Sequence, residues 1–347
     1  MNAMKALVLA GGTASRLRPF SNSLPKQLIP LAGRPVLEHV LRGIADIGVR
    51  DTAIVVGDTA PAVMDAIGDG ARLGLRVTYV PQARPLGLAH CVTLARPFLG
   101  DDDFVMYLGD NLLPGGIAGP ARRFRDRRPS AQLLLRRVAD PRAFGVAEVG
   151  RDGVVRRLEE KPAHPRTDLA VLGVYFFTSA VHAAIDACRP SRRGELEITD
   201  AIQVLIDRGR TVRAVEHTGH WRDIGRPADV LACNRRLLAE LRPRTDGDLD
   251  AATEVTGGPV VIEPGARVVR SRITGPALVG ADTVLTDCEI GPDAAIGRDC
   301  SLRGVRLRDA VVLDGTSLSG PADVRAALVS PVAAHSVIDP AASGAPG

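Results

Sequence analysis

The chain has 347 residues, 45% of them apolar, and its acidic and basic side chains nearly cancel to a formal net charge of +4. This length allows one large domain with a smaller one, and the small net charge gives no reason to expect nucleic acid as a partner. Five scattered cysteines form no CxxC pair, which argues against a disulfide framework or a zinc site and favours a reducing cytoplasm.

Apolar segments are short throughout the sequence. The run before Gly11 is too short for the hydrophobic region of a signal peptide, and no stretch reaches the length of a transmembrane helix. We therefore expect a cytoplasmic protein that has no membrane partner.

The first two thirds of the chain alternate short β-rich runs with amphipathic segments. The expected strands are 6–10, 52–56, 76–80, 104–108, 132–138 and 171–177. The expected helices include 36–47, 88–98, 180–188, 197–208 and 228–241. This alternation is typical of an α/β fold with a Rossmann-like, doubly wound sheet that is mixed but mainly parallel. Ligands of such sheets bind outside the carboxyl ends of the strands.

A second architecture follows. Aliphatic residues recur every 17 positions in three series that stay in phase, and short turn sequences follow the first series. One inward aliphatic residue per strand and three strands per coil predict a three-sided β-helix, although a small β-sandwich with chance spacing is the alternative. The series are Ile262, Val279, Ile296 and Leu313; Val268, Leu285 and Leu302; and Ile273, Ile290, Leu307 and Val324. We expect an α/β domain over 1–242, a linker over 243–258, the β-helix over 259–326 and a tail over 327–347.

The segment after the first expected strand begins with a glycine pair, and no acidic residue occurs before Glu38. It matches neither the GxGxxG fingerprint nor a P-loop. Glycine still allows close backbone approach, and arginine and lysine bind phosphate oxygens, so the segment favours a phosphate site over a plain turn with solvated arginines. The cations involved are Arg16, Arg18 and Lys26.

Two aspartates are candidate metal ligands. Asp110 ends the strand at 104–108, and Asp223 lies beside the chain's only tryptophan. A carboxylate at a strand's carboxyl end can hold Mg²⁺ against a phosphate, but such residues are also common caps and turn formers. The Glu160–Lys161 pair and Arg193 are, from their spacing alone, equally consistent with surface charge.

Taken together, these segments resemble the sugar nucleotidyltransferases, in particular the long form of the glucose-1-phosphate thymidylyltransferase family. The nine matching blocks, in family order, are LAGGTASRLRP (9–19), LPKQLIPLAGRPVL (24–37), PLGLAH (85–90), YLGDN (107–111), FGVAEV (144–149), LEEKP (158–162), LGVYFF (172–177), RRGELEITDAI (192–202) and WRDIG (221–225). The 17-residue coils are similar to the left-handed parallel β-helix of the longer members.

The resemblance implies transfer of a thymidylyl group from dTTP to glucose 1-phosphate, giving dTDP-glucose and pyrophosphate in the first step of deoxysugar nucleotide biosynthesis. The sugar phosphate attacks the α-phosphorus in line with Mg²⁺ assistance, and because it is already an anion it needs no general base. We also expect a homo-oligomer. Alternatives are the same chemistry with UTP or another sugar 1-phosphate, including mannose-1-phosphate guanylyl transfer, and a non-catalytic regulatory homologue. Acyl transfer by the β-helix is disfavoured because its coils contain no histidine.

The resemblance also implies roles for individual residues. Arg16 neutralises the leaving pyrophosphate and Lys26 bridges phosphates, while Asp110 and Asp223 bind Mg²⁺. The implied nucleotide-binding residues are Gly11, Gly12, Gln82 and Gly87. The implied sugar and sugar-phosphate contacts are Gly145, Glu160, Lys161, Gly173, Tyr175 and Arg193. Two departures from the family pattern, Ala14 for a glycine and Phe144 for a tyrosine, bear on substrate preference rather than on activity.

Overall fold

The computed structural model describes residues 4–12 and 24–331, which separate into two compact units. Residues 4–12 and 37–221 form the first, called here the α/β unit, and residues 24–36 and 222–331 form the second, called the β-helix unit. Among the described residues, no helix is long and apolar enough to span a bilayer.

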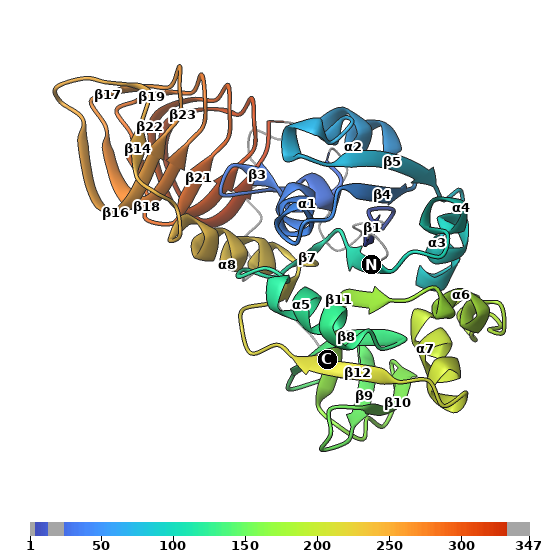
Figure 1. Cartoon of the computed structure of the whole chain (residues 1–347). Helices are drawn as coiled ribbons and strands as arrows, with labels where there is room; N and C mark the ends of the chain where they lie inside the picture. The colour runs from blue at the N-terminus through green and yellow to red at the C-terminus, as the bar shows by residue number, and fades with distance from the viewer. Residues whose placement is uncertain (1–3, 13–23, 332–347) are drawn as a thin grey trace. The chain divides into compact units, whose positions relative to one another are not determined.

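A nine-stranded mixed sheet forms the centre of the α/β unit (Figure 1). Its strands are β1 (Lys5–Leu9), β4 (Asp51–Val56), β5 (Arg76–Pro81), β6 (Phe104–Leu108), β8 (Ala131–Arg137), β9 (Gly145–Val149), β10 (Val155–Glu160), β11 (Leu169–Phe177) and β12 (Val212–Glu216). The order is β10-β9-β11-β6-β1-β4-β5, with β8 beside β11 and β12 beside β8. Strands β6, β1, β4 and β5 are parallel, and β11 is antiparallel to β6, β8 and β9.

Helices cover both faces of this sheet. They are α1 (Val36–Asp46), α2 (Ala60–Ile67), α3 (Leu88–Leu94), α4 (Arg96–Leu99), α5 (Ala118–Arg127), α6 (Ala180–Ile185) and α7 (Ile198–Asp207), with a 3₁₀ turn η4 (Ala71–Leu73) and a short strand β7 (Asn111–Leu112). Leu7 and Leu9 share a core cluster with residues of α3, α6 and α7. Val8 points the other way, because it and Leu37 of α1 both approach Gly109. The doubly wound α/β prediction is confirmed.

Two of the elements that the sequence analysis did not predict, β10 and α5, are mostly polar. In β10 only Val155 and Leu158 are buried, and in α5 only Ala121 and Phe124 are. The expected helix 88–98 is interrupted at Ala95, and Pro97 stands at the start of α4. Proline has no N–H to continue the hydrogen bonding of the preceding helix, so the single predicted helix becomes two.

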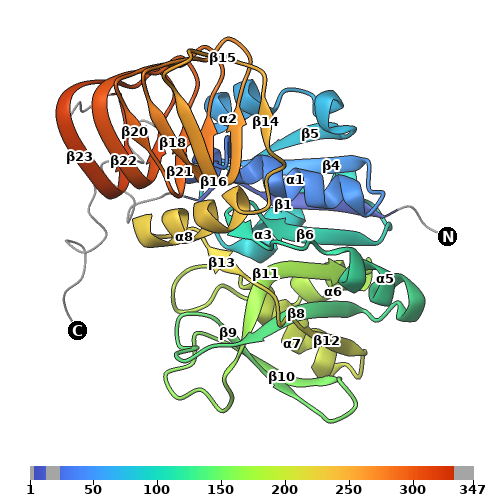
Figure 2. The same ribbon diagram turned by 90° about the vertical axis from the view of Figure 1, so that its left-hand side faces the viewer.

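The β-helix unit contains a parallel three-sided coil, whose strands lie side by side in Figure 2. Its strands are β14 (Arg244–Thr245), β15 (Asp248–Leu249), β16 (Glu254–Ile262), β17 (Arg267–Val269), β18 (Arg272–Val279), β19 (Val284–Thr286), β20 (Glu289–Ile290), β21 (Ala294–Ile296), β22 (Ser301–Val312) and β23 (Ser317–Val329). The second and third aliphatic series pair in register as predicted, for example Val268 with Leu285 and Ile273 with Ile290.

The first aliphatic series ends differently from the prediction. Ile296 pairs with Val312 and not with Leu313, so this coil has one residue fewer. The residues with positive φ at one corner of the coil show the same shift. Gly265, Asp282 and Asp299 follow the 17-residue spacing, but the next one is Gly315, one position earlier than that spacing predicts. Glycine and aspartate are residue types that tolerate positive φ, which explains why the turn sequences carry them.

Three further segments belong to the β-helix unit beside the coil. They are the 3₁₀ turn η3 (Lys26–Leu28), the hairpin of β2 (Pro30–Leu31) and β3 (Arg34–Pro35), and helix α8 (Pro227–Leu238). A small core joins hairpin, helix and coil through Ala32, Leu238 and Leu278. The buried Asn234 amide connects the same parts, because its Oδ1 accepts the Ala32 N–H at 2.9 Å and its Nδ2 donates to the Asp293 carbonyl at 3.5 Å.

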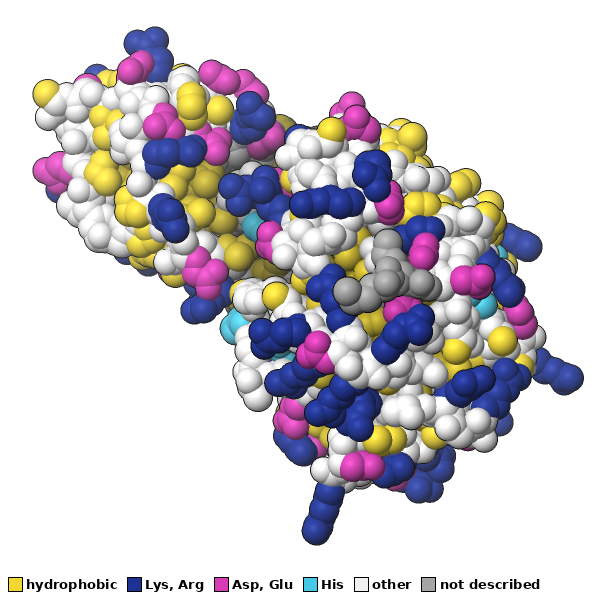
Figure 3. Space-filling view, in the orientation of Figure 1, with side chains coloured by type: hydrophobic (Ala, Val, Ile, Leu, Met, Phe, Trp, Pro, Cys, Tyr) yellow, Lys and Arg dark blue, Asp and Glu magenta, His cyan; other side chains and the backbone are white. Residues whose placement is uncertain are grey.

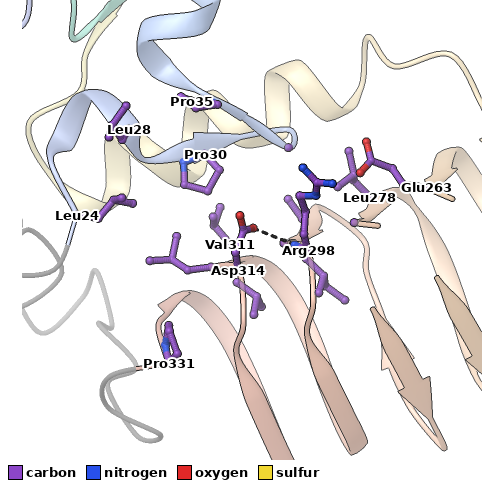
Figure 4. Close-up of a pocket in the computed structure, with 17 residues that line it drawn as sticks. Leu24, Leu28, Pro30, Pro35, Glu263, Leu278, Arg298, Val311, Asp314 and Pro331 are labelled. Carbon is purple, nitrogen blue, oxygen red and sulfur yellow. Dashed lines mark hydrogen bonds between the residues drawn. The ribbon is translucent and has the colours of Figure 1, made fainter. Parts of the chain in front are cut away.

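A groove of about 350 Å³ lies between this N-terminal segment and the coil. Figure 4 shows Leu24, Leu28 and Pro30 on one wall and Val311 of the coil on the other. Arg298 stands at the rim, where its backbone N–H donates to Asp314 Oδ1 at 2.9 Å. The lining is mainly apolar, and the contact with the coil beside the groove is made by the hairpin, where Ala32 packs with Leu278.

On the face drawn in Figure 3, basic side chains lie interspersed with acidic ones. Many charged side chains of the described residues form ion pairs, such as Arg137 with Asp168 at 2.6 Å and Arg270 with Asp287 at 2.7 Å. Exposed pairs of this kind add little stability, but they account for the near-neutral balance of a chain rich in arginine.

Replacing a coil-core residue should destabilise the β-helix strongly. Leu285 is fully buried, so Leu285→Ala should lower the free energy of unfolding by about 2 to 5 kcal/mol through lost burial and a residual cavity. Val284, the preceding residue on the same strand, is 39% exposed, and Val284→Ala should change stability by about 0.5 kcal/mol or less. Denaturant unfolding of both variants measures this, and equal effects would contradict the assigned register.

Candidate active site

The carboxyl ends of four parallel strands form one edge of the α/β unit. Backbone hydrogen bonds continue past the strands here: Gly109 N donates to the Leu9 carbonyl at 2.9 Å, and Gln82 N donates to the Val56 carbonyl at 2.8 Å. A Cβ added at Gly11 would lie 3.4 Å from Gly57 N and 3.7 Å from Gln82 Oε1. The structure therefore places Gly11 and Gln82, both predicted nucleotide contacts, next to each other.

Gly87 joins two segments that are far apart in the sequence. It has φ +102°, and a Cβ there would lie 2.7 Å from Leu196 N, so only glycine fits. On either side of it, Leu196 N donates to the Leu86 carbonyl at 2.8 Å and Ala89 N donates to the Leu196 carbonyl at 3.0 Å. The loop after Gln82 is thus fastened to the segment that follows Arg193.

Glu160 lies in a tight pocket at the end of β10. Thr199 Oγ1 donates to Glu160 Oε2 at 3.1 Å, and Lys161 Nζ lies 3.7 Å from Oε1. A Cβ on Gly145 would lie 2.8 Å from Thr199 Cγ2 and 3.4 Å from Glu160 Oε2, so this glycine makes room for both side chains. Burial raises the pKa of the Glu160 carboxyl; the Lys161 ammonium opposes the rise and the Glu197 carboxylate adds to it.

Arg193 is held by two carboxylates. Its Nη2 lies 2.9 Å from Glu195 Oε2 and 3.1 Å from Glu197 Oε1. Glu197 is only 5% exposed, and its Oε1 also accepts a hydrogen bond from Ser191 Oγ at 2.8 Å. Five N–H donors in a planar fork allow the guanidinium to keep these bonds and still offer donors outward.

A third group surrounds Asp110, directly after β6. Asn111 Nδ2 donates to Asp110 Oδ1 at 2.9 Å, and Trp221 Nε1 donates to Asn111 Oδ1 at 2.8 Å. Gly173 of β11 packs against the Asn111 amide. Tyr175, two residues along the same strand, is 5% exposed and stacks on Phe177, and burial raises the pKa of its hydroxyl, with the Glu160 carboxylate adding to the rise.

The remaining predicted residues lie elsewhere. Gly12 is exposed just after β1, and Arg16 and Ala14 lie outside the described residues. Lys26, the first residue of η3, and Asp223, in the short exposed strand β13 (Arg222–Asp223), belong to the β-helix unit.

Comparisons with known proteins identify the family of the chain. The family model described as "Nucleotidyl transferase" matches residues 5–240. Glucose-1-phosphate thymidylyltransferases from Streptomyces griseus and Streptomyces antibioticus are each 50% identical to the chain, over 94% of it and 92% of their own lengths. The chain belongs to the nucleotidyl transferase family. A crystal structure from Bacillus anthracis, of a protein assigned as a glucose-1-phosphate thymidylyltransferase, is 34% identical with a TM-score of 0.62, and covers 67% of this nucleotidyl transferase and 94% of that chain.

Four polar side chains of this nucleotidyl transferase received no role from the sequence. Thr199 and Glu197 hold Glu160 and Arg193, and Asn111 and Trp221 approach Asp110. All four lie inside the motif blocks, three of them nearly fully buried, but their partners come from other elements of the fold. The sequence could have indicated these four residues only through their short distance along the chain from a predicted site residue.

Neutralising Glu160 should stabilise the protein at neutral pH. Because its pKa is raised in the folded state, the folded protein binds this proton more tightly than the unfolded chain, and stability falls as pH rises through that pKa. Glu160→Gln should therefore raise Tm by about 2 °C at pH 7.5, with the gain shrinking towards pH 4.

The matched control is Glu159→Gln. Glu159 is exposed and pairs with Arg157 at 3.1 Å, so its neutralisation should give no gain. Calorimetric melting across pH 4 to 8 compares the two variants, and a Tm gain for Glu160→Gln that does not depend on pH would contradict the shifted pKa.

Proposed function

We propose that this nucleotidyl transferase is a glucose-1-phosphate thymidylyltransferase, which converts dTTP and glucose 1-phosphate into dTDP-glucose and pyrophosphate. The observation that carries the proposal is the pair of backbone hydrogen bonds by which Leu196 links the loop after Gln82 to the Arg193 segment. These bonds join the two segments within one unit, which supports a nucleotide side at the loop and a sugar-phosphate side beside it. The 50% identity to two thymidylyltransferases supports the choice of substrates.

On the nucleotide side, Gly11 and Gly12 allow the triphosphate to approach the backbone. Gln82, beside Gly11, pairs with the edge of the base, and Gly87, in the loop that follows, packs close to the base. Arg16 neutralises the leaving pyrophosphate, and Lys26 bridges the phosphates that react.

On the sugar side, Glu160 accepts hydrogen bonds from hexose hydroxyls, and Gly145, Gly173 and Tyr175 shape the space around the ring. Lys161 and Arg193 bind the sugar phosphate. The carboxylates of Glu195 and Glu197 fix the Arg193 guanidinium before the substrate arrives, so less side-chain entropy is lost on binding.

The reaction then follows from charge and position. An oxygen of the sugar phosphate forms a bond to the α-phosphorus of dTTP, and the bond from that phosphorus to the bridging oxygen of pyrophosphate breaks. Pyrophosphate leaves with the electron pair, and the nucleophile carries no proton to remove. The protein therefore contributes alignment and cationic neutralisation rather than acid–base catalysis.

We assign Mg²⁺ to Asp110 and Asp223. Among the described residues, no group of three or more His, Cys, Asp or Glu side chains is arranged to hold a metal. One or two carboxylates completed by phosphate oxygens and water is the donor set that Mg²⁺ takes at nucleotide sites, and each of these residues offers a carboxylate of that kind. When bound, the ion supplies positive charge to the phosphates that react. We further propose that the protein acts in the cytoplasm as a homo-oligomer.

The substrate assignment is tested by pyrophosphate release from dTTP, UTP, GTP and ATP, each with glucose 1-phosphate or mannose 1-phosphate. We expect dTTP with glucose 1-phosphate to give the highest kcat/KM. Higher kcat/KM for UTP would replace the thymidylyl assignment with a uridylyl one, and no turnover with any pair would contradict the enzymatic function.

Removing the Arg193 charge should weaken sugar-phosphate binding selectively. A hydrogen bond to a charged group is worth about 1.5 to 3 kcal/mol, so Arg193→Gln should raise KM for glucose 1-phosphate about tenfold or more, with KM for dTTP nearly unchanged. Arg192→Gln, at the exposed neighbouring position, is the control and should behave as wild type. Steady-state kinetics separate the outcomes, and a rise in KM for dTTP alone would place Arg193 on the nucleotide side.

A further inference from the structure

The single tryptophan of the chain takes part in a hydrogen-bonded chain that ends on Asp110. Trp221 Nε1 donates to Asn111 Oδ1 at 2.8 Å, and Asn111 Nδ2 donates to Asp110 Oδ1 at 2.9 Å. An indole N–H is only a donor, so it must face the amide oxygen. This fixes which end of the amide faces Asp110: the NH₂ group does, and a carboxylate oxygen accepts from it.

The Asn111 side chain has little freedom to adopt another arrangement. It is 3% exposed, and a Cβ on Gly173 would lie 2.8 Å from its Cγ, so β11 packs against the back of the amide. The indole ring is itself supported by Phe144, whose ring centroid lies 5.6 Å away at an interplanar angle of 65°. Such an edge-to-face contact is a favourable aromatic geometry.

We propose that Trp221 is a positioning residue for the metal carboxylate, acting on Asp110 through the Asn111 amide. The inference rests on the proposed role of Asp110 as a metal ligand. With the indole in place, the amide N–H holds Asp110 Oδ1 and sets the direction in which the carboxylate faces a cation. Without it, the amide keeps only its bond to Asp110 and loses the second bond that fixes its orientation, so the carboxylate is held less firmly.

Loss of the Trp221 hydrogen bond should lower the affinity of the protein for its metal ion. Hydrogen-bond partners behind a metal ligand typically change metal affinity by about 10- to 100-fold when they are removed. The sugar-phosphate contacts at Lys161 and Arg193 belong to other hydrogen-bonded groups, so their affinity for substrate should change much less.

The test uses Trp221→Phe, which removes the N–H donor and keeps an aromatic ring beside Phe144. Mn²⁺ binding to the full-length protein with dTTP, and without sugar phosphate so that no turnover occurs, is followed by loss of the free-Mn²⁺ EPR signal. We expect the dissociation constant for Mn²⁺ to rise about tenfold. We also expect a similar rise in the Mg²⁺ concentration for half-maximal turnover, with KM for glucose 1-phosphate at saturating Mg²⁺ within about threefold of wild type. An unchanged Mn²⁺ affinity would overturn the proposal.

Two further variants separate the possible failures. Asn111→Leu removes the amide, and in that background Trp221→Phe should have no additional effect on Mn²⁺ affinity, because the two changes break one connection. Full additivity would contradict transmission through Asn111. Asp110→Asn that leaves Mn²⁺ affinity unchanged would overturn the metal assignment itself, whereas a loss with Asp110→Asn and none with Trp221→Phe would overturn only the positioning role.

One measurement needs no variant. The wild-type protein has one indole N–H and so gives one cross-peak in a ¹⁵N-indole spectrum. Saturation of the dTTP-bound protein with Mg²⁺ should shift this cross-peak, since the cation draws charge from Asp110 and the hydrogen-bonded chain responds. A cross-peak that does not move on saturation would contradict the proposal.

Discussion

Parallel strands can present ligand-binding groups at one edge of a sheet only if the backbone hydrogen bonds between neighbouring strands continue to the last residue of each strand. In this protein the register from β6 through β1 and β4 to β5 continues one residue further, at Gly109, Ala10 and Gln82. Gly11, Gln82 and Asp110 are therefore positioned by backbone bonds rather than by loop side chains. The buried interiors of β1, β4 and β6 stabilise this arrangement, because they pack against helices on both faces of the sheet.

Some of the site is arranged at a cost in stability. Glu160 and Glu197 are partly desolvated carboxylates whose charges repel, which raises the pKa of Glu160. A sequence selected for stability alone would neutralise one of them. Hydrogen bonds from Thr199 and Ser191 and the Arg193 ion pair offset part of the cost. The outcome is a fixed acceptor beside a fixed cation, which is the pairing that a sugar phosphate needs.

The sequence predicts best where burial repeats with a fixed period. The apolar runs of β1, β4 and β6 and the 17-residue spacing of the coils are of this kind, and both architectures were predicted from them. β10 and β12 carry weak signals because each buries only two residues. The sequence predicted Leu313 instead of Val312 as the last residue of the first aliphatic series, because both residues are aliphatic. The requirement for glycine at Gly87 and Gly173 arises from Leu196 and Asn111, which come from elements distant in sequence.

The β-helix coils contain no histidine that could catalyse acyl transfer, so the β-helix contributes to the protein through what its coils contact. The coils contact the hairpin that follows Lys26. Leu278 and Ala295 pack with Ala32, and the buried Asn234 side chain forms hydrogen bonds with both the hairpin and a coil. A buried amide with both ends bonded tolerates little displacement, since breaking either bond leaves a polar group unpaired. The coil therefore acts as a rigid support for the hairpin that directly follows η3. A repeat without catalytic side chains is useful to a transferase in this way, because Lys26, which we propose to bridge the phosphates, gains from a backbone that does not move.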